Sequence, residues 1–66
     1  MSRLTIFELL NLRSEWEETV RGFKRVNKES TLENLQTFVD NGYKSNRLRP
    51  KYEQAMEIAQ KILDNA

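Results

Sequence analysis

The sequence contains no cysteine and no histidine, and it has one proline and two glycines among 66 residues. Without cysteine, the chain forms no disulfide and offers no thiolate to a metal. Without histidine, it lacks the commonest general base and the commonest zinc ligand. Two isolated glycines do not build a phosphate-binding glycine loop. These absences argue against an enzyme, and we expect no catalytic residue, cofactor, metal or small-molecule substrate.

Length and composition indicate one small folded domain over residues 1–66, with 38% hydrophobic and 32% charged residues. A chain of this size buries only about 60% of its unfolded surface, so oligomerisation would add useful stability. No segment approaches the roughly 18 apolar residues of a membrane span. The N-terminus lacks the apolar stretch and cleavage site of a signal peptide. The expected location is the cytoplasm.

The longest amphipathic segment begins at Thr5. Thr5 and Glu8 form the T-x-x-E pattern of a capping box. Apolar residues then recur with steps of three and four, which is a helical period: Leu9, Leu12, Trp16, Val20 and Phe23. Gly22 opposes the helix, since glycine costs up to about 1 kcal/mol relative to alanine in a helix interior. The pattern predicts one helix over about 5–28 with a weak point at Gly22.

A second amphipathic segment follows a polar break. Ser30 and Glu33 form another capping-box pattern. Helical spacing continues through four apolar residues: Leu32, Leu35, Phe38 and Val39. Gly42 suits the residue just past a helix C-terminus. The second helix is therefore expected over about 31–41.

Pro50 sets the start of the third helix, because proline is well tolerated at the first helical position. The expected span is about 50–64, with its buried side at Tyr52, Ala55, Met56, Ala59, Ile62 and Leu63. The sequence thus predicts a small all-α three-helix bundle with the first helix longest. Short connections favour antiparallel packing of neighbouring helices. Four aromatic residues fall on the expected core faces: Trp16, Phe23, Phe38 and Tyr52.

The N-terminal end of the first helix is apolar on every side, and Phe7 projects about 160° away from Leu9. Such a helix needs cover all round. Either the rest of the chain covers this end or a second chain does. In the second case, the residues that bind the partner are Leu4, Phe7 and Leu10.

The net charge is only +1, but residues 19–28 and residues 44–51 each carry a net charge of +4. The first block consists of Arg21, Lys24, Arg25 and Lys28, which form one stripe if the first helix reaches residue 28. The second consists of Lys44, Arg47, Arg49 and Lys51. Cations near a helix N-terminus oppose the helix dipole, so helix stability does not explain the second block. Both blocks are either solvated surface or contacts for phosphate or an acidic protein surface.

Together these features predict a non-catalytic protein–protein interaction module, a small regulator or inhibitor that masks a macromolecular partner and that can self-associate as a homodimer. The alternative is a small nucleic-acid-binding regulator, with the second and third helices arranged like a helix-turn-helix. The expected connection of about seven residues departs from the usual 3–4-residue turn of that motif. Ten acidic residues against eleven basic ones also favour a protein partner. A membrane surface is not expected, because acidic residues share the polar face of the first helix.

Overall fold

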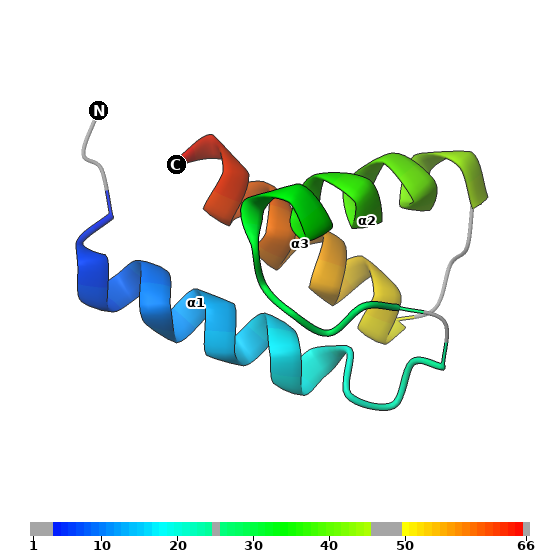
Figure 1. Cartoon of the computed structure of the whole chain (residues 1–66), viewed down its shortest axis with the longest axis horizontal. Helices are drawn as coiled ribbons and strands as arrows, with labels where there is room; N and C mark the ends of the chain where they lie inside the picture. Colours follow the sequence, from blue (N-terminus) through cyan, green and yellow to red (C-terminus); the bar gives the residue numbers. More distant parts are fainter. Residues whose placement is uncertain (1–3, 25, 46–49, 66) are drawn as a thin grey trace.

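The computed structural model describes residues 4–24, 26–45 and 50–65, with the backbone alone at 43–45 and 50. This part of the chain contains three helices and no strand: α1 (Ile6–Thr19), α2 (Leu32–Ser45) and α3 (Pro50–Asp64), shown in Figure 1. The prediction of a small all-α three-helix fold is confirmed. None of these helices combines the length and the apolar character needed to cross a membrane.

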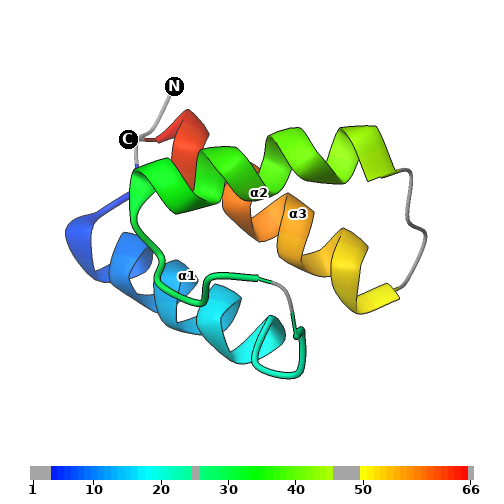
Figure 2. The ribbon, with the colours of Figure 1, turned by 45° about the vertical axis from the view of Figure 1, so that its right-hand side comes forward.

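Helix α3 packs against both other helices and forms the centre of the bundle. Figures 1 and 2 show α1 and α2 running in the same general direction, with α3 running the opposite way. The expected antiparallel packing therefore holds for α2 and α3 but is wrong for α1 and α2. The reason is the connection over residues 20–31, which returns to the end of the bundle where α1 begins. The two ends of the described chain meet there, and the Leu4 backbone N–H lies 3.5 Å from Asn65 Oδ1.

Helix α1 begins as its sequence predicts. Thr5 is the N-cap, and its Oγ1 accepts a hydrogen bond from the Glu8 backbone N–H at 3.1 Å. The Thr5 backbone N–H donates in turn to Glu8 Oε1 at 2.9 Å. Both halves of the capping box are present, and they satisfy two N–H groups that the helix itself leaves unpaired.

The end of α1 differs from the prediction, because the helix stops at Thr19 and not near residue 28. A tight turn follows, in which the Phe23 N–H donates to the Val20 carbonyl oxygen at 2.9 Å. Gly22 lies in this turn, where its low helix propensity opposes continuation. Helix α1 has 14 residues, α2 has 14 and α3 has 15, so the three helices are nearly equal in length.

Helix α2 is capped by Thr31, one residue later than expected. Thr31 Oγ1 accepts a hydrogen bond from the Asn34 N–H at 3.2 Å, which is the N-cap arrangement. Ser30 turns toward α1 instead, and its Oγ donates to Glu17 Oε2 at 2.6 Å. The end of the connection is thereby joined to α1. The predicted Ser30–Glu33 capping box is wrong.

Helix α2 also runs through Gly42 to Ser45, so Gly42 does not terminate it. Gly42 is buried at the contact with α3. A Cβ atom at this position would lie 2.5 Å from Met56 Sδ and 3.2 Å from Tyr52 Cε1. Gly42 therefore lets α2 approach α3 closely, which is one of the main uses of glycine in a packed structure.

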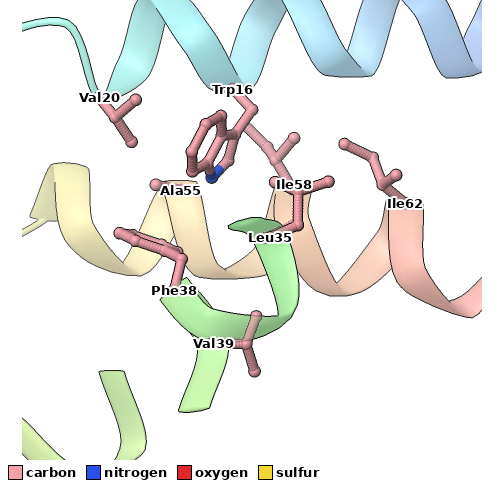
Figure 3. Packing of buried hydrophobic residues seen from close by; sticks show 9 residues of the cluster. Trp16, Val20, Leu35, Phe38, Val39, Ala55, Ile58 and Ile62 are labelled. Carbon is pink, nitrogen blue, oxygen red and sulfur yellow. The ribbon is translucent and has the colours of Figure 1, made fainter. Parts of the chain in front are cut away.

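The core lies where the inner faces of the three helices meet, and Figure 3 shows its packing. It consists of nine buried side chains: Trp16, Val20, Leu35, Phe38, Val39, Ala55, Ile58, Ala59 and Ile62. Trp16 reaches from α1 toward the other two helices and meets Phe38 edge to face, with ring centroids 5.4 Å apart. Its indole N–H has no hydrogen-bond partner within the described residues. The predicted core role of Trp16 and Phe38 is confirmed, and Phe23 and Tyr52 pack half-buried against the same cluster.

Candidate interaction surface

An apolar groove lies between the N-terminal half of α1, the first residue of α2 and the last turn of α3. Its walls are formed by Ile6, Leu9, Leu10, Arg13, Leu32 and Ile62, and it encloses about 360 Å³. Five of these six residues are apolar, and the hollow is open to solvent. We call this feature the apolar groove. It has the lining expected of a site that binds another apolar group.

Large apolar side chains stand exposed at this end of the molecule. The side chain of Phe7 is 77% exposed, that of Ile6 is 72% exposed and that of Leu10 is 53% exposed. The cause is the geometry of α1: it is apolar around its whole N-terminal half, whereas α3 covers one side of it only. Exposed apolar groups that gather at one place, unlike scattered ones, mark interaction surfaces.

The sequence prediction for this end named Leu4, Phe7 and Leu10. Phe7 and Leu10 are exposed, and Leu4 is half-buried beside the end of α3. The other possibility was that the rest of the chain covers Phe7 and Leu10. The described residues do not cover them. Whether these residues bind a partner stays a prediction.

Two residues of this surface were not assigned to it from the sequence. Ile6 lies one helical turn before Leu10, so the i, i+4 spacing could have indicated a shared face. Leu32 follows the helical spacing of the second apolar segment, but it is 43% exposed. It occupies the first position of α2 and lines the groove together with Ile62 of α3. Sequence periodicity alone gives no signal for that difference.

Among the described residues, Arg13 is the only charged one that lines the groove. Its side chain is half-buried, and within the described residues it makes no ion pair or hydrogen bond. Arg21, two turns further along the chain, by contrast pairs with Glu18 across 3.5 Å, with both side chains largely in solvent. Within the described part of the chain, Arg13 therefore has no ion-pair partner at the edge of an apolar surface.

The first basic block does not form the predicted stripe, because α1 ends before it begins. Arg21 and Lys24 are exposed. Lys28 turns back on its own connection, where its Nζ donates to the Phe23 carbonyl oxygen at 2.6 Å and approaches that of Val26 at 3.5 Å. Lys28 thus stabilises the turn after α1. Arg25 lies outside the described residues.

The second block is described only in part. Lys51 is exposed in the first turn of α3, and Lys44 lies in the last turn of α2. Arg47 and Arg49 lie outside the described residues. Because α2 extends to Ser45, four residues separate it from α3, and the predicted connection of about seven is wrong. Phosphate binding by these residues stays a prediction.

One titratable group at the start of α1 is perturbed. The Thr5 backbone N–H, and to a smaller extent the Thr5 side chain, lower the pKa of Glu8 by hydrogen bonding to its carboxylate. Hydrogen bonds to the charged form of an acid favour that form. Glu8 therefore helps to hold the start of α1 in place when it is ionised.

Comparison with protein-family models, with curated proteins and with solved structures gives no match for this chain. The function has to be argued from the groove and from the side chains around it.

Proposed function

We propose that the protein is a non-catalytic interaction module that binds a protein partner through the apolar groove and the side chains beside it. The single observation that supports this proposal most strongly is the exposure of Ile6, Phe7 and Leu10 around an open apolar hollow. Binding would cover a part of the partner's surface, as a small regulator or inhibitor does. The proposal includes the cytoplasmic location expected from the sequence.

The energetic argument rests on burial of apolar surface. Removing an apolar side chain of this size from water contributes about 1.5–3 kcal/mol. Three such side chains are enough to account for much of a typical hot spot, which consists of a few well-buried anchors. An exposed ion pair contributes only about 0–1 kcal/mol. The groove, and not the basic residues, is therefore the source of affinity in this proposal. The exposed cations Arg21, Lys24 and Lys51 lie at the other end of the bundle, beside the end of α1 and the start of α3, and are not part of this contact.

The test compares two variants that add the same charge. Phe7→Glu places a carboxylate on the proposed surface, whereas Gln54→Glu places it at an exposed position of α3 that does not line the groove. Tagged versions of the wild type and both variants are used to capture partners from native lysate, and recovered proteins are quantified by mass spectrometry. We expect a partner that the wild type and Gln54→Glu retain and that Phe7→Glu loses.

Circular dichroism of both variants serves as the folding control. Phe7 is mostly in solvent, so Phe7→Glu should leave the helix content and the unfolding midpoint nearly unchanged. Equal recovery of every protein by Phe7→Glu and the wild type would contradict the proposal. Recovery that disappears after nuclease treatment would favour the nucleic-acid alternative instead.

A further inference from the structure

We infer that the apolar groove takes the Phe7 side chain of a second copy of this chain, so that two molecules associate about a two-fold axis. This inference rests on the proposed function, since it assumes that the groove is a binding site. It goes further by naming the occupant. Each protomer then supplies one inserted phenyl ring and one groove.

The first argument is that the groove and Phe7 lie on opposite flanks of one exposed ridge. With 3.6 residues per turn, Phe7 projects about 60° to one side of Leu10, whereas Ile6 and Arg13 project about 40–60° to the other. Ile6 and Arg13 line the groove, but Phe7 does not. A surface that carries both a projecting ring and a hollow, side by side, can be complementary to itself across a two-fold axis.

The second argument is that a second copy covers both the Phe7 ring and the groove. A single foreign side chain would fill the groove but leave the ring of Phe7 in water, where it is 77% exposed. In the two-fold dimer, both rings and both grooves are buried at once.

The third argument concerns Arg13. Arg13 lines the groove without an ion pair among the described residues, so the occupant must be compatible with a positive charge. The face of an aromatic ring is such a group, because its π electrons attract a cation. Phe7 of a second copy satisfies this requirement without any acidic residue.

The size of the surface sets the strength of association. Four exposed apolar side chains, Ile6, Phe7, Leu10 and Leu32, form a patch on the order of a few hundred Å². A stable specific interface buries about 800 Å² on each partner. The inferred dimer is therefore a weak one, with a dissociation constant on the order of micromolar or above.

The inferred contact also fixes the relative orientation of the two α1 helices. For the Phe7 flank of one α1 to meet the groove flank of the other, the two α1 helices must run in the same direction on either side of the axis. Ser14, one turn after Leu10, then lies close to its own copy. Glu17 lies on the same face two turns after Leu10, so the helices must diverge toward their C-terminal ends to keep these carboxylates apart.

The first experiment measures self-association by sedimentation equilibrium of the full chain from micromolar to millimolar concentration. The variants are Phe7→Ala and, as a control at an exposed position of α3, Gln54→Ala. We expect Phe7→Ala to raise the dissociation constant on the order of a hundredfold, since each dimer holds two copies of the contact, and Gln54→Ala to leave it unchanged. A wild type that stays monomeric over the whole range would overturn the inference.

The second experiment tests insertion of the ring into the groove of the other copy. Phe7→Ala keeps its groove, and Ile6→Ala keeps its phenyl ring but has a damaged groove. Each variant alone has both symmetric contacts impaired, whereas a mixed dimer has one intact contact and one contact that carries both defects. Damage to the groove costs little where the ring is already absent, so after the statistical factor of two we expect the mixed dimer to have a dissociation constant below the geometric mean of those of the two variants. A mixed dimer at that mean would overturn insertion across the axis.

The third experiment tests the direction of the helices by disulfide cross-linking, which the lack of native cysteine makes simple. Ser14→Cys should form a covalent dimer under mild oxidation faster than Gln54→Cys, an exposed control position on α3. Antiparallel α1 helices centred on Leu10 would separate the two Ser14 positions by about 12 Å along the helices. Equal rates for the two variants would contradict the parallel arrangement.

These outcomes separate the inference from the proposed function. A monomeric wild type that still loses a foreign partner on Phe7→Glu would overturn the homodimer and leave the interaction module standing. A monomeric wild type whose captured proteins do not depend on Phe7 would overturn both.

Discussion

The phenyl ring of Phe23 stacks on the phenol ring of Tyr52, with centroids 5.8 Å apart and ring planes within 9° of parallel. Tyr52 in turn meets Phe38 at 5.0 Å, and Phe38 meets Trp16 at 5.4 Å. The four rings form a continuous aromatic row that joins the connection after α1 to α3, α2 and α1. Through Phe23, this row packs the connection against the bundle.

Phe23→Ala should lower the free energy of unfolding by about 2 kcal/mol, because it removes a half-buried ring from the row. In a double-mutant cycle with Tyr52→Ala, the coupling energy should be about 0.5–1.5 kcal/mol, the range for an aromatic pair. Urea unfolding followed by circular dichroism measures all three variants. A coupling energy near zero would show that the two rings do not stabilise each other.

The two glycines should respond in opposite directions to alanine. No atom lies within 4 Å of a Cβ built at Gly22, so Gly22→Ala should stabilise the protein by about 0.4–1 kcal/mol through the unfolded chain. Gly42→Ala should destabilise it by up to about 1 kcal/mol, because the flexible end of the Met56 side chain must move away from the new methyl group and the ring of Tyr52 is crowded. Chemical denaturation of both variants checks the two signs.

The collision at Gly42 has its own control. In a Met56→Ala background, the thioether that meets the new Cβ is gone. Gly42→Ala should then cost much less than in the wild type, or even stabilise α2 through its higher helix propensity. A cost that is the same in both backgrounds would assign the effect to something other than Met56.

The lowered pKa of Glu8 predicts that the stability of the protein depends on pH. Because the pKa of Glu8 is lower in the folded protein than its ordinary value of 4.5, ionised Glu8 stabilises the fold. This contribution is complete above pH 4.5 and is lost as the pH falls through the lowered pKa. Wild type should therefore lose more stability between pH 5 and pH 3 than Glu8→Gln. Parallel curves of unfolding free energy against pH for the two proteins would show that the capping box does not act in this way.

Trp16→Phe should be tolerated better than its complete burial suggests. The smaller ring leaves a cavity, which is costly, but the substitution also removes a buried N–H that has no partner in the described structure, and such a group costs about 1–3 kcal/mol. The two effects oppose each other, so the net loss should stay below about 1.5 kcal/mol. Trp16→Leu removes the same N–H but also the contact with Phe38, and thermal unfolding should show a larger loss for it.

Features that depend on neighbours in the chain were predictable from the sequence. Thr5 and Glu8 identify the start of α1, and Pro50 identifies the start of α3, because capping hydrogen bonds and proline geometry act within one helical turn. The apolar spacing around Trp16 identified the face that enters the core. The apolar character of the start of α1 on every side was also visible in the sequence, but whether the rest of the chain covers it was left open, and the structure shows Phe7 and Leu10 exposed.

Local signals failed where they competed with tertiary packing. Phe23 continues the apolar period of α1, yet it reaches the core from a turn, where it can stack on Tyr52. Gly42 resembles a helix terminator, yet it lies inside α2, because its missing side chain lets α2 and α3 approach. Phe23 has the apolar character and Gly42 the low helix propensity that the sequence indicates. Which structure each residue takes depends on its contacts with residues far away in the sequence.

The sequence by itself determined three amphipathic helices, the start signals of α1 and α3, and a core rich in aromatic rings, because these follow from hydrogen bonds and periodicities of a few residues. Only the tertiary structure decided where α1 ends, that α1 and α2 run in the same direction, and that Leu32 joins Ile6 and Leu10 around a groove. These features depend on contacts between residues more than twenty positions apart. Such contacts contribute to stability only when the whole chain has folded.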